Sequence, residues 1–83
     1  MNLIDSSGWL EYFSGSLLGQ AYSVAIHDTD NLLVPAICIY EVFKRNLVQG
    51  SEETALKAVG WMSLGNIVEL DQELAIMAAY YSA

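Results

Sequence analysis

Three short apolar runs alternate in this chain with segments whose apolar residues recur at helical spacing. The runs are Leu3-Ile4, Leu32-Leu33-Val34 and Ile67-Val68-Glu69-Leu70. Short apolar strands that alternate with helices are typical of a parallel sheet with helices on both faces. The sequence therefore predicts an α/β fold with parallel strands near residues 2–5, 32–34 and 67–70.

Capping and breaking residues place the helices. We expect them from about Trp9 to Ser14, from Leu18 to about Asp28, from Pro35 to Gly50, from Ser51 towards Gly65, and from Asp71 onwards. Pro35 suits a first helical position, and Ser51 and Asp71 can cap a helix start with their side chains. The residues expected on the inner faces of the last three helices are Ala36, Ile39, Tyr40, Phe43 and Leu47, then Ala55, Val59 and Met62, then Leu74, Ala75, Ala78 and Tyr81.

The apolar content is high for a chain of this size. Hydrophobic residues make up 54% of the 83 residues and charged residues 16%, which excludes a disordered chain. A domain this short buries only about 60–65% of its unfolded surface. A sheet also has about 4–6 strands as a rule, more than the three expected here. We therefore expect one domain over residues 1–83, incomplete at its C-terminus or sharing apolar surface with another chain.

Charge and cysteine content exclude several classes of protein. The net charge of −7 argues against binding a nucleic-acid backbone by bulk charge, although it permits binding through metal ions held on carboxylates. The single cysteine excludes an internal disulfide and fits a reducing, cytoplasmic compartment. No apolar run reaches about 18 residues, so no membrane span is expected.

Two carboxylates stand out by position. Asp5 closes the first strand, and ligands of parallel α/β folds bind at the carboxyl ends of strands. An N-cap for the next helix explains Asp5 equally well. Glu41 interrupts an apolar helical turn, where it either pairs with Lys44 or Arg45 or joins Asp5 in a site for a hard cation such as Mg²⁺.

The segment Asp5-Ser6-Ser7-Gly8-Trp9 after an apolar strand, followed by Val34-Pro35-Ala36-Ile37-Cys38-Ile39-Tyr40-Glu41-Val42, resembles the PIN-domain ribonucleases. The most similar subgroup is the toxin half of prokaryotic VapBC toxin–antitoxin pairs. Ile67-Val68-Glu69-Leu70-Asp71 and the apolar residues after it are similar to the third strand and next helix of that family. The resemblance covers the whole chain in order and spacing.

The resemblance implies a three-layer PIN-like fold, truncated here to about three parallel strands with helices on both faces. It implies an endoribonuclease that hydrolyses RNA phosphodiesters with Mg²⁺ or Mn²⁺. Asp5 and Glu41 then hold the metal, and Ser7 is a polar neighbour. The partners implied are an antitoxin protein, an RNA substrate and a second copy of the chain. Two or three further acidic residues of the family lie beyond the segment matched here, and Asp71 and Glu73 do not replace them because they start a helix.

Two alternative functions stay open. A catalytically inactive, truncated toxin-like module would bind an antitoxin or itself. A phosphoacceptor receiver-like domain would need a second strand-end Asp and a late Lys, which we do not identify. His27-Asp28-Thr29-Asp30 is expected to be a solvated helix end and Cys38 a small core residue. If the half beyond the third strand is absent, we expect an open edge at Leu3–Asp5, with Trp9, Phe13 and the last helix exposed.

Overall fold

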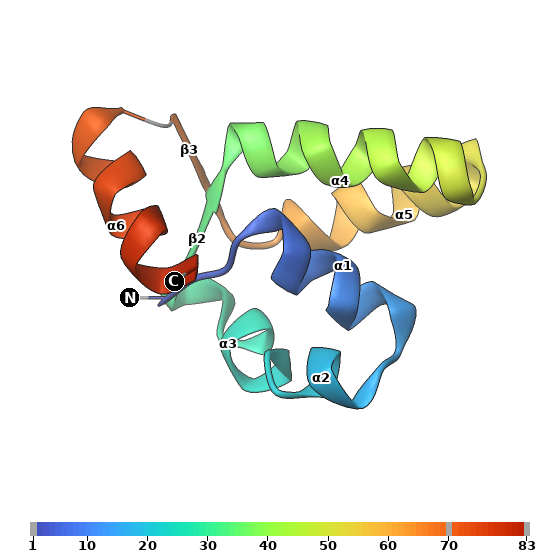
Figure 1. The fold of residues 1–83 in the computed structure, drawn as a ribbon, viewed down its shortest axis with the longest axis horizontal. Helices are drawn as coiled ribbons and strands as arrows, with labels where there is room; N and C mark the ends of the chain where they lie inside the picture. The colour runs from blue at the N-terminus through green and yellow to red at the C-terminus, as the bar shows by residue number, and fades with distance from the viewer. Residues whose placement is uncertain (1, 70, 83) are drawn as a thin grey trace.

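The computed structural model describes residues 2–69 and 71–82, with the side chains of residues 78, 81 and 82 left aside. The described elements, in chain order, are β1 (Asn2–Leu3), α1 (Ser6–Ser14), α2 (Leu17–Gln20), α3 (Ser23–His27), the 3₁₀ helix η1 (Thr29–Asn31), β2 (Leu32–Pro35), α4 (Ala36–Gln49), α5 (Glu52–Met62), β3 (Asn66–Val68) and α6 (Gln72–Ser82) (Figure 1).

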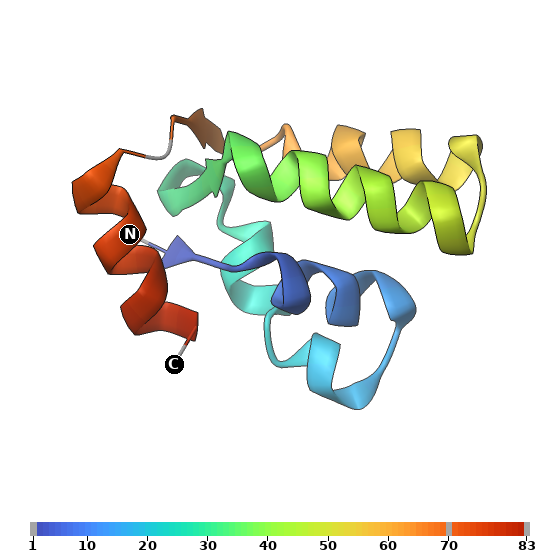
Figure 2. The ribbon, with the colours of Figure 1, turned by 45° about the horizontal axis from the view of Figure 1, so that its top comes forward.

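The strands form one parallel sheet in the order β1-β2-β3. Leu3 lies opposite Leu33, and Val34 lies opposite Ile67. The paired helices α4 and α5 lie on one side of the sheet and α6 lies on the other (Figures 1 and 2). The predicted α/β class and parallel pairing are therefore confirmed. Within the described residues β1 pairs only with β2, which leaves it at the edge of the sheet as expected.

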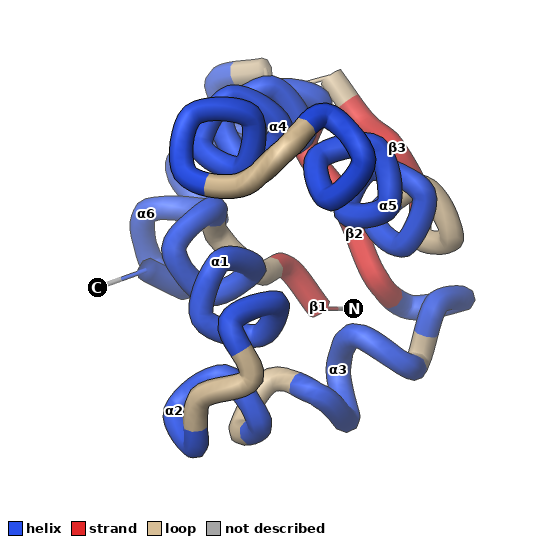
Figure 3. The backbone as a smooth tube through the Cα atoms, turned by 90° about the vertical axis from the view of Figure 1, so that its right-hand side faces the viewer, coloured by secondary structure: helices blue, strands red, loops and turns tan. Residues whose placement is uncertain are grey.

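The helix predicted from Leu18 to Asp28 is wrong, because the chain forms two short helices there. The amide of Ala21 donates to Leu18 O, and the amide of Tyr22 donates to Gly19 O. These bonds join residues three apart, as in a 3₁₀ turn, and α2 therefore ends before α3 begins. Gly19 is buried where α2 folds back on α1 (Figure 3). A Cβ built on Gly19 would meet the backbone carbonyl of Glu11. The close approach of the two helices therefore overrides the helical periodicity of the sequence.

The buried face of α4 differs from the predicted one. Cys38 and Val42 face the core, whereas Ala36, Tyr40 and Leu47 are exposed and Ile39 and Phe43 are half-buried. The first turn of α4 is apolar on every side, so spacing did not determine which side packs inward. Pro35 is buried, ends β2 and stands at the N-cap rather than at the predicted first helical position.

The remaining helices follow their predicted caps with small changes. The hydroxyl of Ser51 accepts from Thr54 N, and the carboxylate of Asp71 accepts from Leu74 N. The buried residues of α5 are Ala55, Ala58 and Met62, with Val59 half-buried. In α6, Leu74 is half-buried and Ala75 is exposed, and the predicted Ala78 and Tyr81 lie outside the described side chains.

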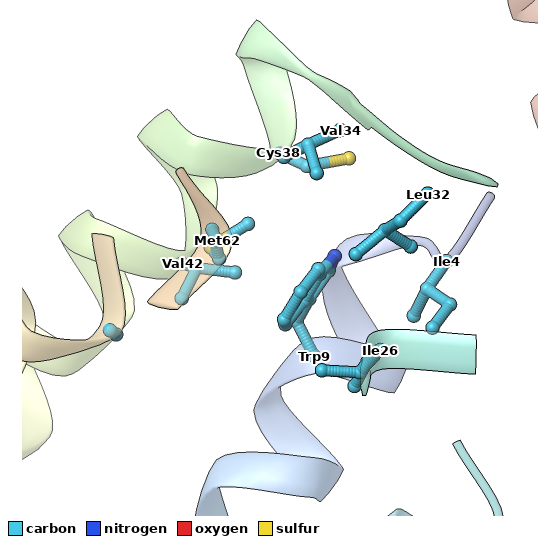
Figure 4. Packing of buried hydrophobic residues seen from close by; sticks show 9 residues of the cluster. Ile4, Trp9, Ile26, Leu32, Val34, Cys38, Val42 and Met62 are labelled. Carbon is cyan, nitrogen blue, oxygen red and sulfur yellow. The ribbon is translucent and has the colours of Figure 1, made fainter. Parts of the chain in front are cut away.

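Trp9 is the centre of the core, so its predicted exposure is wrong. Its side chain is fully buried beside Ile4, Ile26 and Leu32 (Figure 4). The Trp9 ring stacks on half-buried Phe13 with 5.6 Å between ring centroids. In the described part of the chain, Trp9 Nε1 has no hydrogen-bond partner. Trp9 thus joins α1 to the sheet at the cost of one unpaired donor.

Two glycines test whether the approach of α2 to α1 matters. Gly19→Ala should destabilise the fold by about 1–3 kcal/mol, because its methyl group meets the Glu11 backbone, which cannot move alone. Gly60→Ala is the matched control: a Cβ there meets nothing within 4 Å, so the helix should gain about 0.5–1 kcal/mol. Urea unfolding measures both free energies. Equal effects of the two substitutions would contradict the packing described here.

Candidate functional site

Asp5 is both an N-cap and an acid at the carboxyl end of β1. Its Oδ1 accepts hydrogen bonds from Gly8 N at 2.9 Å and from the Ser7 hydroxyl at 3.0 Å. These bonds explain why α1 starts immediately after this residue. They engage one oxygen, and no described residue donates a hydrogen bond to Oδ2. The capping function therefore leaves Asp5 with an oxygen that can bind a ligand.

Glu41 is exposed on the second turn of α4, one turn beyond the carboxyl end of β2. Its Oε1 accepts a hydrogen bond from Ser6 Oγ at 2.8 Å. Neither Lys44 nor Arg45 forms a salt bridge with it among the described residues. Lys44 lies instead over the Tyr40 ring, 5.8 Å from its centroid. The ordinary helical ion pair expected as one alternative for Glu41 is thus not formed.

The structure brings Asp5 and Glu41 to one pocket, which we call the carboxylate pocket. Its volume is about 370 Å³, and it is lined by Asp5, Ser6, Ser7, Leu10, Glu41 and Arg45. Asp5 comes from the end of β1 and Glu41 from the helix after β2, so the parallel pairing of these strands positions both. The three site residues predicted from the sequence, Asp5, Ser7 and Glu41, therefore line the same pocket.

The sequence pattern did not identify Ser6, Cys38 or Arg45 as site residues. Ser6 makes the direct bond to Glu41, a contact between residues 35 positions apart. The only signal for it is the pair of serines after Asp5, of which Ser7 matches the family pattern. The sequence suggests Arg45 as an ion-pair partner for Glu41 and, with Lys44, as a base that would meet the phosphate of an RNA substrate, but not as a residue of the metal site. Cys38 is in the core as expected, but its proximity to the carboxylates could not be read from a helical pattern.

Cys38 reports on the electrostatics of the pocket. Burial raises the pKa of its thiol, a hydrogen bond with the Ser6 side chain opposes the rise, and the charges of Glu41 and Asp5 add to it. The two carboxylates therefore act on one sulfur atom from two different elements. This shared effect is consistent with their lining of a single pocket.

The donor set suits a hard cation only in part. Carboxylate and hydroxyl oxygens are the ligands that Mg²⁺ prefers, and Mg²⁺ is usually held by one or two protein carboxylates with waters and substrate phosphates. Asp5 and Glu41 meet that need. Residues 2–69 and 71–82 contain no group of three or more His, Cys, Asp or Glu side chains arranged to hold a metal ion. A cation on this pair would therefore bind weakly.

The other candidates stay where the sequence placed them. His27 ends α3 and contacts Tyr12, with 3.1 Å between His27 Nε2 and the Tyr12 hydroxyl. Asp28 accepts two hydrogen bonds from the Asn31 amide. Asp71 caps α6 and does not line the carboxylate pocket. These residues contribute to local structure.

Comparisons with protein-family models, with curated proteins and with solved structures found no match to this chain. Among the residues that the structure describes, no helix has the length and apolar character needed to cross a membrane.

The pKa of Cys38 provides a test of the pocket's charge. Because the thiol pKa is raised, alkylation by iodoacetamide should still accelerate with pH above about 8.5, where a free cysteine is half ionised. Glu41→Gln removes a negative charge, so the midpoint of the rate profile should move to lower pH. Glu52→Gln on α5 is the control and should leave the midpoint in place. An unchanged midpoint in Glu41→Gln would show that its charge does not reach the sulfur.

Proposed function

We propose that this chain is a PIN-type endoribonuclease, the toxin component of a toxin–antitoxin pair, which hydrolyses RNA phosphodiester bonds with Mg²⁺ or Mn²⁺. The observation that supports this most is the shared pocket of Asp5 and Glu41 at the carboxyl ends of β1 and β2. Ligands of parallel α/β sheets bind at this edge. The resemblance of the sequence to that family supplies the reaction.

Each residue of the pocket has a definite task in this proposal. Asp5 and Glu41 hold the cation through the oxygens that their hydrogen bonds leave open. Ser7 fixes the Asp5 carboxylate and Ser6 fixes Glu41, so both acids are oriented before a ligand arrives. The cation, when bound, supplies a water of lowered pKa and neutralises charge that grows on the phosphate. Leu10 forms an apolar part of the wall.

A non-enzymatic function is the second candidate. A toxin-like module without catalysis would bind an antitoxin or another copy of itself through apolar surface. Leu17, Leu18 and Val24 on α2 and α3 are large apolar side chains that are strongly exposed. Contiguous exposed apolar patches often mark protein interfaces. In either case we propose an antitoxin and a second copy as partners and the cytoplasm as the site of action.

Cleavage of RNA separates the two candidates. The purified chain should cut single-stranded RNA slowly and only with Mg²⁺ or Mn²⁺, since two carboxylates hold the cation weakly. Asp5→Asn and Glu41→Gln should each lower the rate roughly 100-fold or more, because metal ions contribute several kcal/mol to such reactions. The rate is followed on a labelled oligonucleotide after removal of contaminating nucleases.

Asp30→Asn is the matched control, because it removes one negative charge from η1 at the amino edge of the sheet. It should cleave at the unmodified rate. No cleavage by a folded, Mg²⁺-saturated chain would favour the non-enzymatic candidate. Cleavage that survives Asp5→Asn would exclude the carboxylate pocket as the site.

A further inference from the structure

The groove beside α4 collects the positive charge of an acidic protein. Two further pockets continue from the carboxylate pocket along α4. The second pocket shares Leu10 and Arg45 with the carboxylate pocket. The third pocket shares Phe13, Asn46 and Gln49 with the second. Lys57 and Trp61 line the far end. Arg45 and Lys57 thus line this groove, and Lys44, the third cationic residue of the chain, lines an adjoining pocket formed by α4 residues alone.

The acids are distributed differently. Of the ten Asp and Glu residues, Asp5 and Glu41 line these pockets, both at one end. The groove therefore has a carboxylate end, where a cation is needed, and a cationic stretch that can meet an anionic polymer despite the net charge of −7.

Arg45 is the best-placed donor in the groove. It lines the carboxylate pocket and two neighbouring pockets, one helical turn beyond Glu41. Among the described residues its guanidinium forms no salt bridge, although Glu41 lies one turn away on the same helix. An unpaired guanidinium offers a fork of N–H donors that matches a phosphate.

The far end of the groove offers an aromatic surface. The Trp61 side chain is 53% exposed, whereas the other tryptophan, Trp9, is fully buried. Lys57 lines the same pocket, and among the described residues its ion-pair partner is the exposed Glu53, at 3.3 Å, which is a weak interaction. A cationic groove with an accessible aromatic ring is the arrangement that binds single-stranded nucleic acid, through phosphates and base stacking.

We propose that single-stranded RNA reaches the carboxylate pocket along this groove, with Arg45 binding a backbone phosphate and Trp61 stacking on a base. The inference rests on the proposed function for its choice of RNA. From Glu41 to Gln49 the groove follows α4 for about 12 Å. Arg45 is a positioning residue here, because it holds the strand beside the carboxylates and does not hold the metal.

Binding is measured without metal, so that cleavage does not enter. A short labelled single-stranded RNA of mixed sequence is titrated with the full chain in EDTA over a series of KCl concentrations, and fluorescence anisotropy gives the affinity. Arg45→Ala should weaken binding roughly tenfold and reduce the slope of log K against log salt by about 0.7, the loss of one phosphate contact. Arg45→Lys should keep most of the slope.

A charge-matched variant tests position against bulk charge. The double variant Arg45→Ala/Asp30→Asn has the net charge of the natural chain, because the negative charge removed at Asp30 offsets the positive charge removed at Arg45. The Asp30 change lies on η1, away from the groove. It should bind as weakly as Arg45→Ala. Recovery of the natural affinity in this variant, or no change of affinity and slope in Arg45→Ala, would overturn the proposal.

Trp61 gives an independent optical signal. A base that stacks on Trp61 should quench its fluorescence. The change can be assigned to Trp61 because the other tryptophan, Trp9, is buried. Trp61→Phe should remove the quenching and keep binding, whereas Trp61→Ala should weaken binding about fivefold or more. Circular dichroism and thermal unfolding confirm that each variant is folded. Arg45-dependent binding of poly-glutamate in place of RNA would overturn the proposal and indicate an acidic protein partner.

The outcomes separate this inference from the proposed function. Arg45-dependent RNA binding by a chain that never cleaves would support the groove and reject the nuclease. Metal-dependent cleavage by a chain whose RNA affinity ignores Arg45 and Trp61 would support the nuclease and reject the groove.

Discussion

The parallel pairing of β1 with β2 is the constraint on which the site depends. Only two residue pairs, Asn2 with Leu32 and Leu3 with Leu33, define it in the described sheet. Because both strands end at the same edge, α1 and α4 start side by side. An antiparallel pairing would place Asp5 and Glu41 at opposite edges. The burial of Trp9 against Ile26 and Leu32 maintains this arrangement by holding α1 against the sheet.

The hydrogen bond from Ser6 to Glu41 connects local structure to chemistry. Asp5 caps α1, and Ser6, the first residue of α1, donates its hydroxyl to Glu41 on α4. Glu41 accepts the Ser6 hydroxyl, and among the described residues it forms no salt bridge with Arg45, although the two are four residues apart on one helix. The pocket thus has a Glu41 oxygen to which no described residue donates, and the groove has a guanidinium with no salt bridge to a described residue.

Local signals predicted much of the fold. The three apolar runs located the strands because each run is too short for a helix and is bounded by turn or capping residues. Gly15 ends α1 in a left-handed conformation, and the side chains of Ser51 and Asp71 cap the starts of α5 and α6. Packing between distant segments could not be predicted. The break after α2 depends on the close approach of Gly19 to the Glu11 backbone, and the side of α4 that faces the core depends on its packing against α5 and β2.

The site shows the same division. Asp5 and Glu41 could be selected because an acid after a strand and an acid on an apolar turn are locally unusual. Ser6 and Cys38 become functional candidates only through contacts between α1 and α4, and the same contacts place Arg45 at the carboxylate pocket. No residue pattern along one helix shows that its glutamate bonds to a serine on a different helix.

The central claim is that Asp5 and Glu41 share one cation. Electron paramagnetic resonance of Mn²⁺ titrated into the natural chain, Asp5→Asn, Glu41→Gln and the double variant tests it most directly. If both carboxylates hold one ion, each single variant should lose nearly as much affinity as the double variant, a coupling of about 0.5–3 kcal/mol. Losses that simply add, or Mn²⁺ binding that is unchanged in the double variant, would contradict the shared site.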